Sequence, residues 1–201
     1  MSNQSTKELA LFDFDGTITT KDTLVDFIQY AVGKPAYYAG LLWISPVLVG
    51  FVLKMVRNDD AKQKMLGHFF GGWPLDKFQA VADRYSSEQI DRLIRPKALA
   101  KIQWHQRQGH EVAIVSASME NWLSKWCEKH SLKLICTKMD STNNQISGKF
   151  DGKNCHGAEK VNRVKAVYNL EDFDTVHAYG DSSGDKQMLA MADEGHYRLF
   201  E

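Results

Sequence analysis

Three short apolar segments of this chain each end directly before residues that carry carboxylate or hydroxyl side chains. The segments cover residues 9–12, 111–115 and 175–179, and the residues that follow are Asp13-Phe14-Asp15-Gly16-Thr17, Ser116-Ala117-Ser118 and Gly180-Asp181-Ser182-Ser183-Gly184-Asp185. Apolar runs of this length are typical of buried strands, and helical patterns lie between them. Ligands of an open parallel α/β sheet bind beyond the carboxyl ends of its strands. The sequence therefore predicts a Rossmann-like α/β core with one site at that edge.

The carboxylates of this predicted site need a positive counter-charge. Asp13 and Asp15 are two positions apart at a strand end, where like charges oppose each other's ionisation. Asp181 and Asp185 add two more carboxylates after the last of the three segments. Lys160 begins a predicted helix whose apolar positions keep helical spacing. A bound divalent cation, or an anionic substrate that brings counter-charges, would explain why these carboxylates are gathered at one place.

With these motifs in this order, the chain resembles the phosphatases of the haloacid dehalogenase superfamily over essentially its whole length. The segments that correspond to the family's four motifs are DFDGT (13–17), IVSAS (114–118), the lysine of GAEK (157–160) and GDSSGD (180–185). The resemblance implies phosphoryl transfer through an aspartyl-phosphate intermediate, with Mg²⁺ as the cofactor.

The resemblance also implies a role for each of the acidic residues. Asp13 would be the nucleophile, because a carboxylate can split one difficult displacement into two easier ones. Asp15 would protonate the leaving group and later accept a proton from the attacking water. The Mg²⁺ ligands would be Asp13, Asp181 and the backbone carbonyl of Asp15, with Asp185 binding the ion directly or through a water. In other family members the position of Asp185 holds the catalytic lysine instead.

Three further residues would bind the transferred phosphate. Lys160 would place a positive charge against both nucleophile and phosphate, and the Ser116 hydroxyl and the backbone at Ala117 would donate hydrogen bonds to its oxygens. Taken singly, these residues have ordinary explanations. An aspartate beside glycine is usually a turn former, Ser118 would be a helix N-cap, and a lone helix lysine is usually solvated.

The expected activity is hydrolysis of a phosphomonoester, with transfer of the phosphoryl group to another hydroxyl as an open alternative. A protein of a different class, which binds phosphate esters without turnover, would not need the pair Asp13 and Asp15. Equal numbers of acidic and basic residues give a formal net charge of zero, which argues against a nucleic-acid partner. We therefore expect a small phosphorylated metabolite or a lipid phosphate as the substrate.

The chain between Asp15 and Ser116 is far longer than a βα crossover requires. Its patterns predict helices at 22–31, after residue 35, at 59–70 and at 74–94. We expect a core domain of residues 1–18 and 96–201 with an inserted helical cap of residues 19–95. This layout resembles the small cap of subfamily IB, the branch that includes the phosphoserine phosphatases.

Two features depart from the phosphoserine phosphatases. Asp22 stands where those enzymes have a glutamate that recognises the substrate ammonium, and Ser116-Ala117-Ser118 replaces their Ser-Gly-Gly. Their cap arginine has Arg57 as its only suggested counterpart here. Phosphoserine therefore remains one alternative substrate among several.

Residues 35–53 form a stretch of 19 residues without a formal charge. This length is within the range of a membrane span, and Tyr37, Tyr38 and Trp43 suit a membrane interface. Pro46 near the centre predicts a helix break. An uncharged early cap segment of this kind is similar to that of the phosphatidylglycerophosphatase C family. The alternatives are two short helices packed inside the cap, or a segment that contacts a membrane or a lipid substrate.

The expected location is the cytoplasm, with association at the cytoplasmic face of the inner membrane as the alternative that the apolar stretch raises. No basic segment followed by an apolar run precedes Leu9, so no secretory signal is expected. The three cysteines are odd in number and lack metal-ligand spacing, which predicts reduced thiols that pack in the interior.

Overall fold

The computed structural model describes residues 6–201, so residues 1–5 of the predicted core lie outside it. It contains a six-stranded sheet in the order β4-β3-β2-β1-β5-β6. All neighbouring strands are parallel except β3 and β4, which are antiparallel. The strands are β1 (Glu8–Phe12), β2 (Glu111–Met119), β3 (Lys133–Thr142), β4 (Gln145–Asp151), β5 (Thr175–Gly180) and β6 (Glu194–Tyr197). The predicted α/β fold class is confirmed.

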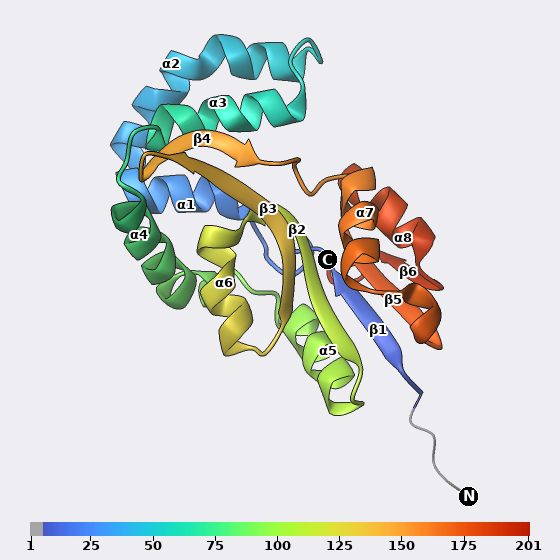
Figure 1. Cartoon of the computed structure of the whole chain (residues 1–201). Helices are drawn as coiled ribbons and strands as arrows, with labels where there is room; N and C mark the ends of the chain where they lie inside the picture. Colours follow the sequence, from blue (N-terminus) through green and yellow to red (C-terminus); the bar gives the residue numbers. More distant parts are fainter. Residues whose placement is uncertain (1–5) are drawn as a thin grey trace, which may run out of the picture.

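Helices cover both faces of the sheet (Figure 1). The alternation of side chains along β1 produces two separate cores. Ala10 and Phe12 pack in the larger core, with residues of α5 (Pro96–Arg107) and α6 (Glu120–Lys129). Leu9 and Leu11 pack in the smaller one, with residues of α7 (Ala158–Val167) and α8 (Lys186–Met191). Three short 3₁₀ helices complete the fold: η1 (Ile90–Arg92), η2 (Leu170–Asp172) and η3 (Ser183–Asp185).

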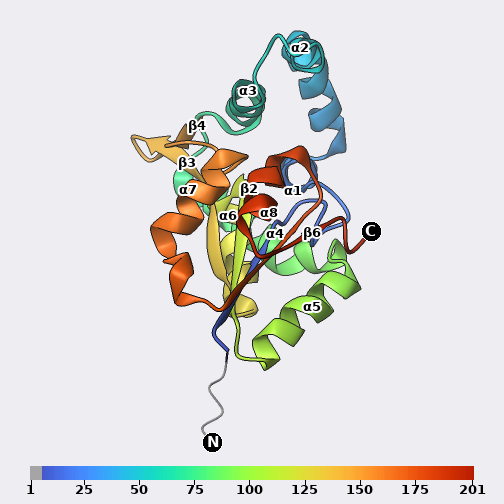
Figure 2. The same ribbon diagram turned by 90° about the vertical axis from the view of Figure 1, so that its right-hand side faces the viewer.

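Four cap-like helices lie between β1 and α5 in the chain: α1 (Thr23–Val32), α2 (Lys34–Val52), α3 (Asn58–Phe70) and α4 (Leu75–Glu88). The two connections to the core run antiparallel to each other. The Thr20 amide donates to the Leu93 carbonyl over 2.8 Å, and the Arg95 amide to the Ile18 carbonyl over 2.7 Å. Figures 1 and 2 show α2 and α3 side by side at one end of the molecule, with α2 outermost. The proposed domain limits at residues 18 and 96 stay a prediction.

One local prediction near the sheet is wrong. The strand expected at 111–115 continues through the serine motif to Met119, so Ser118 lies in β2 and is not a helix N-cap. Strands β3 and β4 form a hairpin, with its turn at Asn143 and Asn144 in the left-handed region at φ 50° and 59°. Asparagine tolerates this conformation better than most residues. As a result β4 extends from the sheet to contact α3.

Helix α2 continues through Pro46, which contradicts the predicted break and the alternative of two short helices. Proline lacks the amide that would bond to the carbonyl of Leu42, four residues earlier. The Ser45 hydroxyl donates to that carbonyl instead, over 2.7 Å. By length and composition α2 could cross a membrane, and 17% of its most apolar 18-residue window is buried in the protein. A long apolar helix is thus left largely exposed on the cap.

The three cysteines are free and buried, as predicted. Burial raises the pKa of the Cys127 thiol to about 12 and that of the Cys155 thiol to about 11. Their role is therefore packing.

Candidate active site

A cleft of about 540 Å³ opens beyond the carboxyl ends of β1, β2 and β5, between the core and the cap-like helices. The cleft lies at the end of β1, where the chain leaves the sheet for the cap. Strand β1 lies between β2 and β5, and the connections to these two strands run on opposite sides of β1. Such a position is the switch point of an open sheet, where ligands usually bind. The core contributes mostly polar residues, and the cap contributes both apolar and polar ones. The predicted site residues that line it are Asp13, Asp15, Asp22, Ala117, Lys160, Asp181 and Asp185.

The Lys160 ammonium is at the centre of the polar side of the cleft. Its Nζ lies 2.5 Å from Asp13 Oδ1 and 2.7 Å from Asp185 Oδ1, and it donates to the Val115 carbonyl over 2.7 Å. Only 1% of the residue is exposed. Burial acts to lower the pKa of this amine, but the two carboxylates outweigh burial and hold the pKa above its ordinary value. The lysine is therefore a fixed positive charge and not a solvated helix residue.

Asp13 is buried directly after β1, and its two oxygens have different partners. Oδ1 faces Lys160, and Oδ2 accepts the Thr17 hydroxyl over 2.9 Å. Burial raises the pKa of Asp13 to about 7 although Lys160 opposes the change, and the nearby Asp185 adds to the rise. One lysine therefore does not offset all the negative charge at this position.

Asp181 lies beside Asp13 after β5. The Thr17 hydroxyl that contacts Asp13 is also 3.1 Å from Asp181 Oδ1. Gly16 makes this approach possible, because its φ is +83° and a Cβ there would collide with the Asp181 carboxylate. Burial raises the pKa of Asp181, and the Thr17 hydroxyl opposes the shift.

Asp185 has a different environment. Its Oδ1 accepts Lys160, and its Oδ2 accepts the Ser182 amide over 2.9 Å and the Ser182 hydroxyl over 2.7 Å. Burial acts to raise the pKa of Asp185, but Lys160 and these donors hold it below its ordinary value. Of the two roles left open by the sequence, holding the lysine is the one these contacts favour.

Oxygen atoms of Asp13, Asp181 and Asp185 lie within 4.8 Å of one another. Carboxylate oxygens are the ligands that Mg²⁺ prefers, usually one or two of them together with waters and substrate phosphate. The cluster contains three carboxylates and the single ammonium of Lys160, so negative charge is in excess. The residues therefore fit a divalent cation held by Asp13 and Asp181.

The Asp15 side chain points away from that cluster. Its Oδ1 accepts the Thr23 amide at the start of α1 over 2.7 Å, and its Oδ2 accepts the Ser118 hydroxyl over 2.6 Å. Ser118 is thus a site residue whose function the sequence did not reveal. Two donors from different elements fix the Asp15 carboxylate between core and cap.

The serine motif is divided between the interior and the cleft. Ser116 is fully buried, and its hydroxyl oxygen accepts the Ser118 amide over 2.9 Å. Ala117 and Ser118 line the cleft, whereas Ser116 does not. Of the two residues predicted to bind phosphate in this motif, Ala117 therefore borders the cleft directly and Ser116 does not.

The cap supplies a cation that the sequence analysis missed. Lys62 on α3 lines the cleft, and its Nζ donates to the Ala117 carbonyl over 2.6 Å. Burial lowers the pKa of Lys62, against the opposing effect of Asp15 and Asp22. Arg57, the counterpart suggested from the sequence, has a side chain that is 81% exposed and lies 3.9 Å from Asp59.

Two further residues near the motifs, Asp22 and His156, also line the cleft. Asp22 is the N-cap of α1, where its Oδ1 accepts the Leu24 amide over 2.9 Å and the Val25 amide over 3.2 Å, while it also lines the cleft. Burial, and next the charge of Asp15, raise the pKa of Asp22. His156, which directly precedes the GAEK motif, lines the cleft as well.

Comparisons with known proteins identify the family and the fold of this chain. The family model of haloacid dehalogenase-like hydrolases matches residues 10–190. The protein CicA of Caulobacter vibrioides is 33% identical over 194 residues, which cover 96% of this chain and 86% of CicA.

Two solved structures share the fold. A protein with unknown function from Bordetella pertussis Tohama I superposes with a TM-score of 0.76 at 20% identity, over 93% of this chain and 87% of that one. A phosphoserine phosphatase with a phospho-aspartyl intermediate analogue gives a TM-score of 0.66 at 18% identity, over 93% and 84%.

Proposed function

The chain belongs to the haloacid dehalogenase-like hydrolases, and we propose that it is a Mg²⁺-dependent phosphomonoesterase that acts through a phosphorylated Asp13. The observation that carries the proposal is the contact of 2.5 Å between Lys160 and Asp13, in a buried cluster with two further carboxylates. The phospho-aspartyl analogue of a phosphoserine phosphatase with the same fold supports the choice of chemistry.

The first step is attack of an Asp13 oxygen on the phosphorus atom of the ester. The bond from phosphorus to the ester oxygen breaks, and Asp15 donates a proton to the leaving oxygen. Lys160 orients Asp13 and offsets negative charge on the transferred group. Bound to Asp13 and Asp181, Mg²⁺ supplies the positive charge that lets a phosphate dianion approach a carboxylate.

The second step releases phosphate. Asp15, now a carboxylate, takes a proton from a water that attacks the phosphorus atom, and the bond between phosphorus and Asp13 breaks. The Thr23 amide and the Ser118 hydroxyl hold Asp15 in place for both steps. A proton acceptor with this job must be within hydrogen-bond reach of the reacting oxygen, and the cleft position of Asp15 allows that.

A phosphate-release assay with an aryl phosphate tests this function. We expect Mg²⁺-dependent turnover by the wild-type protein and none by Asp13→Asn, because the amide keeps the shape of aspartate but is not a competent nucleophile. Glu128→Gln is the control, since the Glu128 side chain forms an exposed ion pair with Lys125 at the surface. Turnover by Asp13→Asn near the wild-type rate would contradict the proposal. A wild-type protein that binds phosphate esters without turnover would favour the non-catalytic alternative.

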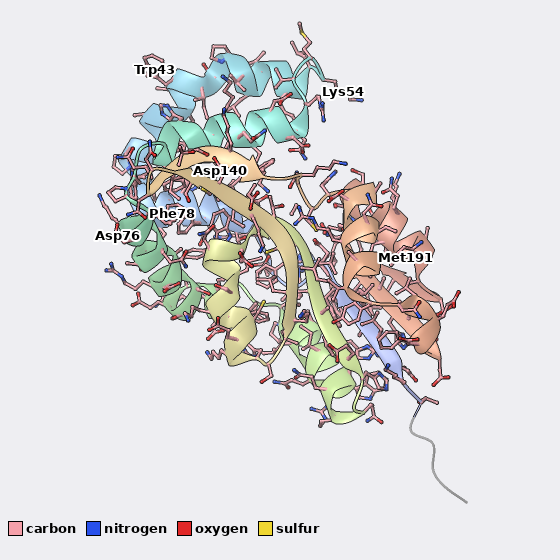
Figure 3. All side chains as sticks on the ribbon, viewed as in Figure 1. Trp43, Lys54, Asp76, Phe78, Asp140 and Met191 are labelled. Atoms are coloured by element: carbon pink, nitrogen blue, oxygen red, sulfur yellow. The ribbon has the colours of Figure 1, made fainter. Side chains whose placement is uncertain are left out.

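A lipid phosphate is the substrate class that one specific observation favours. Helix α2 exposes Leu42 by 78% and Trp43 by 81%, and Figure 3 shows Trp43 on its outer side. The inner side of the same helix reaches the cleft through Leu48 and Phe51. One apolar helix could therefore contact both a membrane surface and the acyl part of a substrate.

The charges near α2 suit an anionic membrane. Lys34, Lys54 and Arg57 are exposed around its two ends, and juxtamembrane basic residues are attracted to anionic lipids. We propose peripheral contact with the cytoplasmic face of a membrane as the arrangement in which this helix would be used.

A sedimentation assay with anionic phospholipid vesicles tests the lipid proposal. Polar replacement of Leu42 and Trp43 should weaken vesicle binding and hydrolysis of phosphatidylglycerophosphate but leave aryl-phosphate hydrolysis unchanged, because both side chains are exposed and away from the catalytic cluster. Trp104→Ser, at a partly exposed tryptophan of α5, is the control. No vesicle binding by the wild-type protein would leave a small phosphorylated metabolite, such as phosphoserine, as the substrate class.

A further inference from the structure

A second cluster of ionisable side chains lies away from the cleft, near the amino ends of the strands. We call it the histidine cluster. It consists of Glu8 at the start of β1, His105 on α5, His110 just before β2, His177 on β5, and Glu194 and His196 on β6. None of these residues lines the cleft, and no step of the proposed reaction uses them. Buried histidines gathered from four different elements need a physical explanation.

The centre of the histidine cluster brings ligand atoms together. His110 Nδ1 lies 2.9 Å from His105 Nδ1 and 3.2 Å from Glu8 Oε2, and Glu8 Oε2 lies 2.8 Å from His177 Nε2. One nitrogen from each of the three histidines lies within 4.8 Å of the others. Ligand atoms around a tetrahedral Zn²⁺ with ordinary bond lengths are about 3.3 Å apart. The contacts of His110 with His105 and Glu8, and of Glu8 with His177, are somewhat shorter than that spacing, so the side chains would move apart slightly to admit an ion.

Hydrogen bonds alone leave His177 poorly satisfied. Its Nε2 faces Glu8, while its buried Nδ1 has no aligned partner and is 3.1 Å from Glu194 Oε2. A neutral imidazole has only one N–H, so one of the two carboxylates would face a nitrogen lone pair. A metal on Nε2 removes this conflict, because the proton then sits on Nδ1, which lies 3.1 Å from Glu194 Oε2. Metal-bound histidines commonly donate their other N–H to a carboxylate in this way.

The contacts of His105 also leave one ring nitrogen directed at the other ligands of the histidine cluster. His105 is fully buried, and its Nε2 lies 2.9 Å from the Tyr179 hydroxyl, which leaves Nδ1 directed at His110. With its proton on Nε2 facing the Tyr179 hydroxyl, His105 would present the lone pair of Nδ1, which is the form of the ring that binds a metal ion.

We propose that the histidine cluster binds one Zn²⁺ ion through His105, His110, His177 and Glu8. Three imidazoles and a carboxylate suit zinc better than Mg²⁺ or Ca²⁺, which prefer oxygen ligands. Four protein ligands leave no open position, which is typical of a structural site and not of a catalytic one. The ion would join the starts of β1 and β2 to β5 and α5, and would hold the sheet that carries the active site.

The test is titration of the metal-free full-length protein with Zn²⁺ and Co²⁺ in a large excess of Mg²⁺, which occupies the carboxylate cluster of the cleft. We expect one Zn²⁺ per chain by calorimetry and a visible absorption band of tetrahedral Co²⁺. His110→Gln and His177→Gln should each abolish the band, and the use of two variants guards against one that fails to fold. Glu194→Gln should keep the stoichiometry but weaken binding by about 10–100-fold, as for other residues that orient a ligand.

His68→Gln is the matched control, because this histidine is exposed on α3 and far from the histidine cluster in the fold. It should leave Zn²⁺ affinity unchanged. Absence of stoichiometric Zn²⁺ binding by the wild-type protein would overturn the proposal. Equal binding by the wild-type protein and both ligand variants would overturn it as well.

Discussion

Replacement of Lys160 by methionine should cause a large loss of stability that depends on pH. The ammonium is 1% exposed and is held between Asp13 Oδ1 at 2.5 Å and Asp185 Oδ1 at 2.7 Å. Methionine fills most of the same volume without the charge. Removal of one partner from a buried ion pair costs about 3–5 kcal/mol, because the remaining charge is left without compensation. We expect a loss of that size in the free energy of unfolding at pH 8 without Mg²⁺.

The sign of the pH dependence follows from the carboxylates that remain. Without Lys160, burial and mutual repulsion should raise the pKa of both Asp13 and Asp185 above the value of about 3.9 in the unfolded chain. A carboxyl group whose pKa is raised in the folded state stabilises the protein at low pH and loses that contribution as pH rises through the folded pKa. The wild-type protein differs at Asp185, because Lys160 holds its pKa below the ordinary value. The cost of Lys160→Met should therefore be smaller at pH 5 than at pH 8.

Urea denaturation of both proteins at pH 5 and pH 8, in buffers without divalent cations, measures this difference. Lys165→Met is the control, since Lys165 is an exposed residue of the same helix. Exposed substitutions of this kind usually change stability by less than about 0.5 kcal/mol. A loss below about 1 kcal/mol for Lys160→Met at pH 8, or an equal loss at both pH values, would refute the account of a charge-compensating lysine.

Three further predictions concern the cleft. Asp15→Asn should slow ester cleavage by about 10²–10⁴-fold, and more for an alkyl phosphate than for a nitrophenyl phosphate, so equal losses on the two would exclude the acid/base role. Because burial raises the pKa of Asp13 to about 7, Mg²⁺ binding should weaken as pH falls from 8 to 6 and should release protons, which calorimetry in two buffers of different ionisation enthalpy detects. Affinity that does not change with pH would contradict this. Lys62→Met should raise KM more than it lowers kcat, whereas Arg57→Met, at an exposed residue, should change neither.

The core of the fold could be predicted because its signals are local. Apolar runs such as residues 9–12 have the length of a buried strand and not that of a helix, and the polar residues after them mark the strand ends. The convergence of Asp13, Lys160 and Asp181 then follows from the topology of a parallel sheet. The sequence order of the motifs was enough to place these three residues in one cleft.

Local signals failed where tertiary contacts decide the outcome. Ser118 has the composition of an N-cap, but pairing with β3 keeps it in a strand and its hydroxyl bonds to Asp15. Pro46 normally interrupts a helix, but the Ser45 hydroxyl replaces the lost donor.

Residues that meet from separate elements without a shared motif were also missed. Lys62 reaches the cleft from the cap, and only the packing of α3 above the sheet brings its amine to the Ala117 carbonyl. His105 and His177 are 72 positions apart in the chain, and their rings lie 4.9 Å apart. No spacing rule on a single sequence joins such residues.

The central claim is that Asp13 becomes phosphorylated, and chemical trapping tests it most directly. Protein mixed with an aryl phosphate and Mg²⁺ is quenched during turnover and treated with borohydride, which reduces an acyl phosphate to the alcohol, so that a phosphorylated aspartate becomes homoserine. Peptide mass spectrometry should find homoserine at position 13 in the wild-type protein, none at Asp15, and none anywhere in the Asp13→Asn variant. Turnover without a trapped residue at position 13, or trapping at Asp15, would contradict the account.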